Sequence, residues 1–508
     1  MISSKASVLQ TNKFFDKHPA LLKKKLGRTG LTVSACGFGA YRVDYRVLEH
    51  SEVLEYAILN GINLIDTSSN YSDGGSEILI GDVLKKLIEG NKLKRDEIVI
   101  VTKGGYIQGK NYELANEKKK KGDAYKEVTE YSEGLWHSIH PDFLKEQITL
   151  SLERLKLDTI DVYLLHNPEY FLDSPLSKDL ELDELRHEYY RRIRNAFEFL
   201  ESEVNSGRIS SYGISSNSFV VKDEEQTFTS FEECLKLANS ISLNNRFDVI
   251  EFPFNLYENG AIVNKNQLSV TKTLLEFASI NNMGVLINRP LNAIRDKKLN
   301  RLADFYVDEE YFKMDEAQIL TEINVLSLME EEFLKEYLEI LKLSDQNREA
   351  VNYFLKAGDL LKDNWKSFGS IENFNDIKKQ FLIPRVNYAF TVMLKSPNMT
   401  NEIKSRLDRI AKQINKLMNI IETIYGLLAK SRSKEIHKKL NSLVQEGELI
   451  QFNSLTLSQK IINLINSIYG VSSTLVGMRQ TKYVDDVLKA LLQPQVKNAV
   501  EIFTNFDK

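Results

Sequence analysis

Residues 61–104 read GINLIDTSSNYSDGGSEILIGDVLKKLIEGNKLKRDEIVIVTKG. The runs GINLIDTS (61–68) and EIVIVTKG (97–104) are short and nearly continuous in apolar residues, which is typical of strands buried on both faces of a parallel sheet. Between them, SEILIGDVLKKLIEG (76–90) carries apolar residues three and four positions apart, a spacing that predicts a helix. The stretch therefore predicts one strand–helix–strand unit with parallel strands.

The same alternation continues along the chain. Six further runs predict strands: VSACGFG (33–39), TIDVYLLHN (159–167), RISSYGISSN (208–217), RFDVIEFPFN (246–255), MGVLINRP (283–290) and SSTLVGM (472–478). Strand starts move from 62 to 98, and from 211 through 248 to 284, by about 36 residues at each step, which is typical of βα units. Eight such units predict a closed (β/α)8 barrel, although a doubly wound sheet has the same local pattern.

Two stretches interrupt this alternation. Residues 104–140 are predicted to form a long loop over one face of the barrel, with Lys118–Lys121 as a solvated surface turn, because like charges repel and stay hydrated. Residues 296–453 are rich in helical patterns and locally basic after Leu394. We therefore expect a mainly α-helical insertion (296–453) between strands seven and eight.

A heptad pattern marks the second half of this insertion. Its apolar positions are Ile403, Leu407, Ile410, Ile414, Leu417, Ile421, Ile424 and Leu428, and the pattern fails at Ser431 and Glu435. Spacings of four and then three predict a coiled-coil or helical-hairpin face, which could also serve a protein partner or self-association through 403–428. The expected domains are an N-terminal extension (1–25), a barrel (26–295 and 454–508) and the insertion.

The composition is that of an average globular protein, with 42% hydrophobic and 27% charged residues. The net charge of −4 is too balanced for a surface that binds nucleic acid, so no nucleic acid is expected. Two cysteines, Cys36 and Cys234, cannot build a disulfide framework, which favours a cytoplasmic location. No apolar run approaches the ~20 residues of a membrane span, and residues 1–22 lack the apolar block of a signal peptide.

Ionisable residues stand at the carboxyl ends of the second, third and fourth predicted strands: Asp66, Lys103 and His166. Barrel enzymes carry their chemistry at these ends, and Tyr71 follows in the loop after Asp66. A neighbouring ammonium lowers the phenol pKa from its usual ~10, a carboxylate keeps the ammonium charged, and an imidazole orients a substrate oxygen. These groups suit the protonation of a developing alkoxide. Because no side chain can supply the hydride, a nicotinamide cofactor is implied.

Several segments resemble the aldo-keto reductase family in their order and spacing: LGRTGLTVSACGFG, GINLIDTSSNY, VIVTKG, SLERLKLDTIDVYLLHNPE and YGISSN, with Ser76, Glu77, Gly81 and Leu84. The resemblance covers about 26–295 and resumes at about 454–490. It implies a (β/α)8 barrel that uses NADPH, with NADH as the alternative cofactor. The helical insertion is not typical of the family.

The resemblance also implies a catalytic tetrad. In it Tyr71 is the general acid, Lys103 tunes the pKa of Tyr71, Asp66 pairs with Lys103, and His166 orients the substrate. Aromatic residues in the loops after strands three and four are candidates for the pocket wall or for loop packing: Tyr106, Trp136, Tyr170 and Phe171.

The segments that resemble cofactor-binding motifs lie at three strand ends. Ser215 and Asn217 match the pair that holds the nicotinamide carboxamide, with Ser216 as the alternative to Asn217. Leu291 and Asn292 would present backbone groups to the pyrophosphate.

The adenine end of the cofactor is expected after the last strand, in TLVGMRQTKYVDDVL. Gly477 would allow close backbone approach, Arg479 would face the 2′-phosphate, and Asp486 would lie near the adenine.

Two positions depart from the family pattern. Asn288 and Arg289 stand where many relatives place an aromatic residue that stacks on the nicotinamide. On strand six the family's amide-bearing residue has no clear match, and Glu251 is the nearest polar residue.

The expected function is an NADPH-dependent oxidoreductase that transfers hydride between the nicotinamide and an aldehyde or ketone, or a sugar or alcohol in reverse. An alternative is a catalytically weak NADPH-binding sensor or interaction protein whose helical insertion binds a partner. A weaker alternative is a barrel enzyme of unrelated chemistry, such as an isomerase. No metal site is expected, because the sequence has no Cys/His cluster with zinc spacing.

Overall fold

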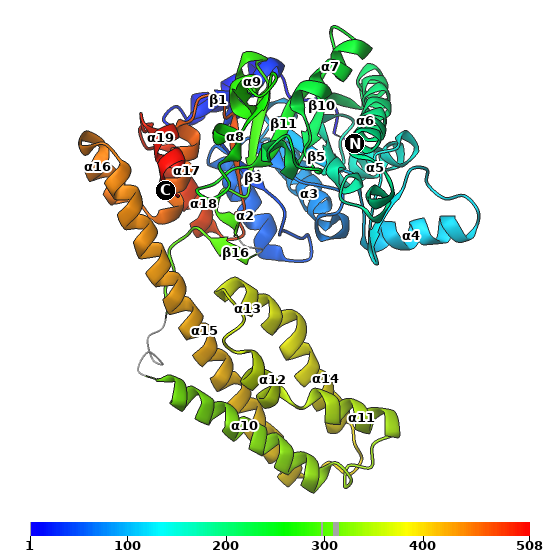
Figure 1. Cartoon of the computed structure of the whole chain (residues 1–508), viewed down its shortest axis with the longest axis vertical. Coiled ribbons are helices and arrows are strands. Elements are labelled where there is room, and N and C mark those ends of the chain that lie inside the picture. The colour runs from blue at the N-terminus through cyan, green and yellow to red at the C-terminus, as the bar shows by residue number, and fades with distance from the viewer. Residues whose placement is uncertain (1, 296–297, 308–313, 508) are drawn as a thin grey trace. The chain divides into compact units, whose positions relative to one another are not determined.

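Eight parallel strands close into a barrel in the computed structural model, which describes residues 2–295, 298–307 and 314–507. Around the barrel they run in the order β3 (Cys36–Gly39), β4 (Leu64–Asp66), β5 (Val99–Gly104), β9 (Ile160–His166), β10 (Ile209–Ser215), β11 (Phe247–Pro253), β14 (Gly284–Asn288) and β17 (Ser473–Val476). Pairing of β17 with β3 closes the ring, which confirms the (β/α)8 barrel and excludes an open doubly wound sheet (Figure 1).

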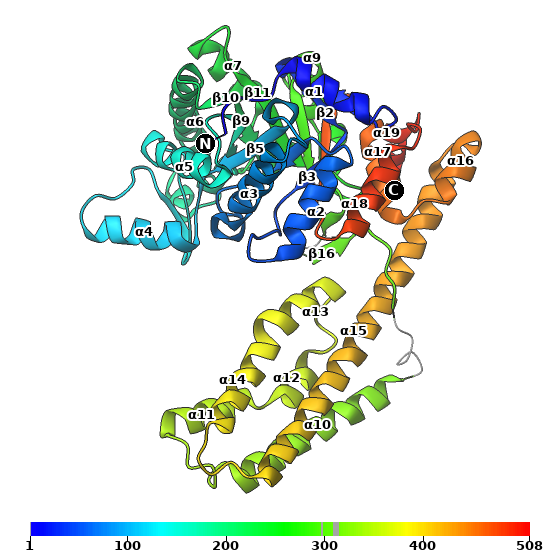
Figure 2. The same ribbon diagram turned by 180° about the vertical axis from the view of Figure 1, so that it is seen from behind.

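Helices surround this ring of strands (Figures 1 and 2). They are α2 (Leu48–Leu59), α3 (Gly75–Glu89), α5 (Pro141–Leu155), α6 (Leu182–Asn205), α7 (Phe231–Ile241), α8 (Gly260–Val263), α9 (Leu274–Ile280), α17 (Leu457–Ser467), α18 (Thr481–Leu491) and α19 (Ala499–Asn505). A capping box begins α17: Thr456 Oγ1 accepts from the Gln459 backbone N–H at 3.2 Å, and Gln459 Oε1 accepts from the backbone N–H of Thr456 at 3.1 Å.

Alternate residues of the strands fill the barrel interior. Val99 and Val101 of β5 and Val162 and Leu164 of β9 belong to one buried cluster, because side chains two positions apart share a face of a strand. The remaining members of this cluster are Leu26, Leu31, Val33, Leu64, Val249, Leu286 and Leu475. The interior is therefore a packed apolar core, and the polar chemistry lies at the strand ends.

The N-terminal part of the predicted first strand belongs to a separate hairpin. Thr32–Ser34 (β2) pairs antiparallel with Lys23–Lys25 (β1), and only Cys36–Gly39 joins the barrel. The hairpin brings Leu26 and Leu31 into the barrel's apolar cluster, which favours this arrangement over a longer first strand. Before it, α1 (Val8–Phe14) begins at Ser7, whose Oγ accepts from the Gln10 backbone N–H at 3.2 Å.

The prediction of a long loop at 104–140 is wrong. The segment folds into a three-stranded sheet and a helix: β6 (Tyr106–Ile107), α4 (Gly109–Lys120), β7 (Thr129–Ser132) and β8 (Leu135–His137). Ile107, Ala115 and Trp136 pack together with Phe143, and this small cluster stabilises elements whose own apolar patterns are too short to show in the sequence. The lysine run accordingly lies at the end of α4 rather than in a turn, and Lys118 pairs with Glu146 at 3.1 Å.

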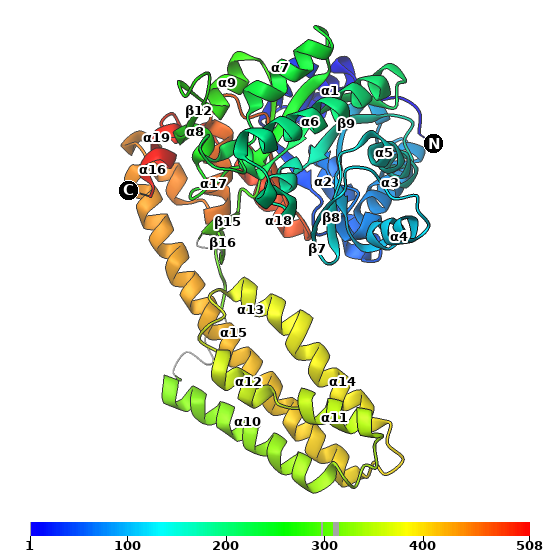
Figure 3. The same cartoon turned by 45° about the vertical axis from the view of Figure 1, so that its right-hand side comes forward.

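The chain divides into two units. One comprises Met1–Ala293 and Leu440–Lys508, and the other is Ile294–Lys439. The second unit is formed by α10 (Glu316–Tyr337), α11 (Asp345–Phe354), α12 (Ala357–Asn364), α13 (Ile371–Ile377), α14 (Ile383–Leu394) and most of α15 (Asn401–Leu443), and its helices lie beside one another (Figure 3). The remaining short elements of the two units are β12 (Lys265–Gln267), β13 (Lys272–Thr273), β15 (Asn292–Arg295), β16 (Lys298–Arg301) and α16 (Glu446–Asn453).

The heptad face of α15 forms the core of the helical unit. Ile403, Leu407, Ile410, Ile414, Leu417 and Ile421 are all buried in one cluster with residues of the other helices. Ile424 is half-buried, and Leu428 is 58% exposed. The apolar pattern therefore marks packing inside this unit, and the helix itself continues past the end of the pattern to Leu443.

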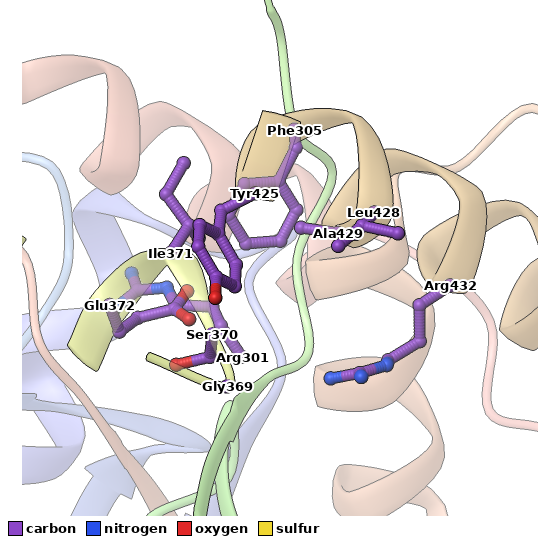
Figure 4. A pocket seen from close by; sticks show the side chains of 10 residues that line it. All are labelled: Arg301, Phe305, Gly369, Ser370, Ile371, Glu372, Tyr425, Leu428, Ala429 and Arg432. Atoms are coloured by element: carbon purple, nitrogen blue, oxygen red, sulfur yellow. The ribbon is translucent and has the colours of Figure 1, made fainter. Parts of the chain in front are cut away.

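A small pocket lies inside the helical unit, between the start of α13 and the middle of α15 (Figure 4). Arg301 and Arg432 line it. Burial raises the pKa of Glu372 above its ordinary value, and the charges of the two arginines oppose this shift in part. Elsewhere in the unit Lys416 pairs with Glu322 at 2.8 Å, so part of the basic charge of α15 is balanced locally.

No helix in the described ranges combines the length and the apolar character that a membrane crossing requires.

A pair of leucine variants tests the heptad assignment. Leu417→Ala is expected to lower the free energy of unfolding of the helical unit by about 2–5 kcal/mol, because it opens a cavity in a fully buried site. Leu428→Ala is expected to cost less than about 0.5 kcal/mol, since its side chain is largely exposed. Urea unfolding in a Trp136→Phe background, followed by the fluorescence of Trp365 in the helical unit, measures both values. Equal losses in the two variants would contradict the assignment.

Candidate active site

The carboxyl ends of the barrel strands bring the four predicted catalytic residues together. Asp66 is the last residue of β4, and Lys103 lies in β5 directly before its final glycine. His166 ends β9, and Tyr71 begins a 3-10 turn (Tyr71–Gly74) that follows β4. Parallel strands of a barrel end on the same rim, so residues far apart in the sequence meet there.

The Lys103 ammonium is the centre of this cluster. Its Nζ lies 2.5 Å from Asp66 Oδ1 and donates to the backbone oxygen of Thr67 at 3.2 Å. Glu251 Oε2, from β11, lies 3.3 Å from the same Nζ. The ammonium is 5.4 Å from the centroid of the Tyr71 ring. Lys103 is fully buried, so two carboxylates and one carbonyl replace water around its charge.

A turn in an uncommon backbone conformation carries Tyr71. Ser72 and Asp73 have φ angles of 51° and 56°, and Gly74 has 85°, all in the left-handed region. This region is costly for residues other than glycine, so surrounding contacts must maintain it. One such contact is the hydrogen bond from Ser72 Oγ to the backbone oxygen of Val43 at 2.8 Å. The position of the phenol is therefore imposed by the tertiary structure.

His166 is held on three sides. Its Nδ1 lies 3.0 Å from Ser68 Oγ, and its ring packs edge-on against Tyr106, with 4.6 Å between ring centroids. The Tyr71 ring lies 5.9 Å away in the same geometry. His137 Nε2 donates to the backbone oxygen of His166 at 2.7 Å. Among residues 2–295, 298–307 and 314–507, none forms a hydrogen bond with His166 Nε2, which leaves this atom for a substrate oxygen.

Both histidines of this group are uncharged at neutral pH. Burial lowers the pKa of His166 well below its ordinary value, and the charge of Lys103 acts in the same direction. Burial also lowers the pKa of His137 to about 4. An imidazole next to a buried ammonium therefore acts here as a neutral hydrogen-bonding group.

The pKa of Tyr71 is raised, contrary to the expectation from the sequence. Burial is the largest cause, Lys103 opposes it, and Asp66 and Glu251 add to it. Lys103 thus lowers the pKa of Tyr71, as expected, but burial and the two carboxylates raise this pKa by more. Burial also lowers the pKa of Lys103, yet Asp66 and Glu251 raise it above its usual value, so Lys103 stays charged.

The sequence did not predict that Glu251 belongs to the cluster around Lys103. It lies in the middle of β11, and all seven residues of this strand are buried. A carboxylate inside such a run is itself a signal, because a charged side chain is rarely fully buried without a partner. The partner is Lys103 on a strand that is not a neighbour of β11 in the sheet.

The strand β10 ends in the predicted carboxamide-binding segment. Ser215 Oγ donates to Glu251 Oε1 at 2.9 Å. Ser216 Oγ accepts from the backbone N–H of Ser218 at 3.1 Å and caps the turn that follows the strand. Asn217 is half-buried, and its side chain has no hydrogen bond to any described residue. The geometry therefore favours Asn217 over Ser216 as the second residue of the pair.

The predicted pyrophosphate segment follows β14. Leu291 is buried, and the half-buried Asn292 already donates its backbone N–H to the Arg289 oxygen at 3.2 Å. The Arg289 guanidinium donates to Glu258 Oε1 at 2.6 Å. The position that carries an aromatic residue in many relatives thus has a polar contact network in this protein.

The segment after β17 contains two open positions. Gly477 is exposed, and a Cβ added there would find its nearest heavy atom at 3.9 Å, so a ligand has room to approach the backbone. Arg479 is exposed and forms no ion pair with the described part of the chain. Asp486 accepts hydrogen bonds from side chains at the start of α17: Thr456, Ser458 and Gln459. Its carboxylate is therefore already occupied within the protein.

The residues at the strand ends fit a nicotinamide nucleotide. Asn288 Oδ1 is a buried acceptor without a hydrogen bond, which suits the NH2 of a carboxamide. The exposed Arg479 guanidinium suits a phosphate. In the described ranges no group of three His, Cys, Asp or Glu residues could hold a metal ion.

Two of the four candidate pocket aromatics lie on the His166 side of the site. Tyr106 packs on His166, and Tyr170 packs on Tyr106 with 5.2 Å between ring centroids. Trp136 belongs to the small apolar cluster of residues 104–140, and Phe171 is only 4% exposed. Tyr106 and Tyr170 therefore remain candidates for a substrate wall, whereas Trp136 and Phe171 serve packing.

Comparison with known proteins shows the family of this chain. The model of the Aldo/keto reductase family matches residues 37–293. The NADH-specific methylglyoxal reductase of Escherichia coli is 30% identical over 178 residues, which are 33% of this chain and 48% of that protein. The NAD(P)H-dependent D-xylose reductase of Scheffersomyces stipitis is 26% identical over 195 residues, 37% of this chain and 50% of that protein.

The chain spans about half the length of these curated relatives. Among solved structures, an aldo-keto reductase from Bacillus halodurans in its holo form aligns over 95% of this chain and 96% of its own, with a TM-score of 0.45 and 14% identity.

The protonation state of the two buried histidines can be measured directly. We expect the ring nitrogens of His137 and His166 to show neutral imidazole between pH 8 and pH 6, because burial lowers the pKa of His137 to about 4 and that of His166 well below its ordinary value. Nitrogen-15 NMR of histidine-labelled protein, assigned with His137→Asn and His166→Asn, provides the measurement. An imidazolium signal from either ring at pH 6 would contradict the burial argument.

Proposed function

Because the chain belongs to the aldo/keto reductase family, we propose that it is an NAD(P)H-dependent reductase of aldehydes or ketones, with Tyr71 as the general acid. The observation that carries this proposal is the position of Lys103, paired with Asp66 at 2.5 Å and 5.4 Å from the centroid of the Tyr71 ring. In the reverse direction the same site would oxidise an alcohol or a sugar.

Each side chain of the cluster has a separate role in this proposal. A bound nicotinamide supplies the hydride, which no side chain can supply. The Tyr71 hydroxyl donates its proton to the carbonyl oxygen as negative charge develops there. Lys103, fixed by Asp66, stabilises the phenolate that remains, and His166 Nε2 donates a hydrogen bond that orients the carbonyl. For this tautomer Ser68 Oγ must donate to His166 Nδ1, at a distance of 3.0 Å, in place of the hydrogen bond that it donates to Asn70 Oδ1 at 2.7 Å.

We propose that the cofactor extends from β10 to the segment after β17. Ser215 and Asn217 would hold the carboxamide, and the backbone at Leu291 and Asn292 would face the pyrophosphate. At the adenine end, Gly477 would allow close approach and Arg479 would bind the 2′-phosphate. Asp486 would act there mainly through the start of α17, since its oxygens already accept hydrogen bonds from that helix.

Arg479 is exposed and forms no ion pair with any described residue, which favours NADPH over NADH, because only NADPH carries a 2′-phosphate for a guanidinium to bind. The substrates we propose are small carbonyl compounds, including reducing sugars, by analogy with the named activities of the methylglyoxal and D-xylose reductases. The two cysteines, Cys36 and Cys234, are free and buried, which fits a reducing cytoplasm.

Removal of the phenolic hydroxyl tests the general acid. Tyr71→Phe is expected to lower kcat for reduction by about 10²–10⁴-fold, the usual contribution of a positioned acid, while NADPH binding stays within twofold. Stopped-flow oxidation of bound NADPH over an aldehyde panel measures turnover, and fluorescence titration measures binding. Unchanged turnover would remove Tyr71 from the mechanism. Tight NADPH binding by the unmodified chain without turnover of any substrate would instead favour a cofactor sensor.

Removal of the Arg479 guanidinium tests cofactor choice. Arg479→Ala is expected to weaken NADPH binding at least tenfold and to leave NADH binding within twofold, because the lost contact involves only the 2′-phosphate. Arg194→Ala is a suitable control, since that guanidinium lies on α6 and is already paired with Glu198. Equal weakening for both nucleotides would show that Arg479 does not read the 2′-phosphate.

A further inference from the structure

Three hydrogen-bonding contacts join the His166 imidazole to two amide side chains that the proposed mechanism does not use. Ser68 Oγ lies 3.0 Å from His166 Nδ1 and donates to Asn70 Oδ1 at 2.7 Å. Asn70 Nδ2 in turn donates to Gln108 Oε1 at 3.1 Å. Ser68 is fully buried, and both amides are half-buried. These three side chains form the Ser68–Asn70–Gln108 network.

The direction of these hydrogen bonds decides which nitrogen of His166 carries a proton. A hydroxyl donates one hydrogen, and Ser68 donates it to Asn70. Toward His166, Ser68 Oγ is then an acceptor, so Nδ1 carries the ring proton and Nε2 has a free lone pair. The other acceptor near Ser68 Oγ, the Lys103 backbone oxygen at 3.3 Å, would give the same result. Because burial lowers the pKa of His166 well below its ordinary value, the ring carries no second proton.

In this direction His166 Nε2 can accept a hydrogen bond from a hydroxyl but cannot donate one to a carbonyl. Half-turns of the two amides reverse the direction, because an amide carries an acceptor on one side and a donor on the other. Gln108 Nε2 then donates to Asn70 Oδ1, and Asn70 Nδ2 donates to Ser68 Oγ. Ser68 donates to His166 Nδ1, and the ring proton lies on Nε2. Within the described ranges, neither amide side chain forms another hydrogen bond that would resist the half-turn.

We propose that Asn70 and Gln108 are positioning residues that set the tautomer of His166 through Ser68. In one direction of the network the imidazole accepts from a hydroxyl group, and in the other it donates to a carbonyl oxygen. Both tautomers carry one ring proton. The change therefore releases a proton from one nitrogen to solvent, takes one up at the other, and leaves the charge of the site unaltered. This inference rests on the proposed function, in which His166 Nε2 meets the substrate oxygen.

Amide side chains support both directions of the network. A carboxylate accepts hydrogen bonds without donating, and an ammonium donates without accepting. A carboxylate at position 108 would hold Asn70 Nδ2 toward itself and keep the observed direction, with the ring proton on Nδ1. An ammonium at the same position would turn the Asn70 oxygen toward itself and place the ring proton on Nε2. The proposal therefore makes opposite predictions for two substitutions at one half-buried position, which two side chains separate from the imidazole.

Gln108→Glu and Gln108→Lys form a matched pair that tests the proposal. Nitrogen-15 NMR of histidine-labelled protein, assigned with His166→Asn, measures the ratio of the Nδ1–H tautomer to the Nε2–H tautomer of His166. This ratio is expected to be at least about tenfold higher in Gln108→Glu than in Gln108→Lys, because each substitution fixes one direction of the network. Equal ratios in the two variants would overturn the proposal.

Turnover is expected to follow the tautomer. The kcat for aldehyde reduction is expected to be about tenfold lower in Gln108→Glu than in Gln108→Lys, because only the fraction of molecules with Nε2–H can donate to the carbonyl. Asn116→Asp makes the same amide-to-carboxylate change within α4 and controls for the added charge. Its tautomer ratio is expected to stay within about twofold of the unmodified chain. A shift in Asn116→Asp as large as that in Gln108→Glu would overturn the proposal, because the charge alone would then explain both.

If either Gln108 variant fails to fold, as judged by circular dichroism, Asn70→Asp replaces the pair. NADP⁺ and a carbonyl compound are then bound together, since these two oxidised partners cannot react with each other. His166 of the unmodified chain is expected to shift toward Nε2–H, and His166 of Asn70→Asp is expected to keep its proton on Nδ1. The same tautomer in both proteins would contradict the proposal.

The measurements also separate this inference from the proposed function. The NMR comparison of the free proteins needs neither cofactor nor turnover. Failure of the unmodified chain to bind either nucleotide, or to reduce any carbonyl compound, would reject the proposed function itself. Normal binding and turnover with equal tautomer ratios in the two Gln108 variants would reject only the role of Asn70 and Gln108.

Discussion

The burial of one ammonium group governs the architecture of the active site. Removing the Lys103 charge from water costs several kcal/mol unless other groups replace the lost hydration. Asp66, Glu251 and the carbonyl of Thr67 supply that replacement from strands β4 and β11 and from the residue after β4. The contacts that keep Lys103 charged thus also connect β5 with β11, which are not neighbours in the sheet. The same charges set the electrostatic environment of Tyr71.

That environment explains why the phenol remains protonated next to a positive charge. A neighbouring ammonium lowers the pKa of the phenol, but burial, which is the largest effect, and the two carboxyl groups together raise it by more. His166 contributes no charge, because burial and Lys103 keep its imidazole neutral. The site therefore combines a proton donor with a neutral hydrogen-bonding group, a pair that suits the delivery of one proton to an oxygen. The left-handed turn at Ser72 and Asp73 keeps the donor in place, and its cost is met by the surrounding structure.

The helical unit illustrates how one sequence pattern can have two structural meanings. Heptad spacing predicts an apolar stripe on a helix, but the spacing does not say which surface covers the stripe. Here the stripe from Ile403 to Ile421 is buried in one cluster with residues of the other helices of the same unit, α10 to α14. Only toward Leu428 does the stripe become exposed. The unit thus has its own apolar core, separate from the core of the barrel.

The barrel, the strands that form it and the places of Asp66, Lys103 and His166 at strand ends were determined by the sequence alone, because each depends on local periodicity and on which residue ends a strand. The tertiary structure decided what depends on contacts between distant segments. It paired Glu251 with Lys103, raised the pKa of Tyr71, occupied Asp486 with the start of α17, and folded residues 104–140 around a small shared cluster. These outcomes depend on burial and on partners far along the chain, and neither is encoded in the spacing of neighbouring residues.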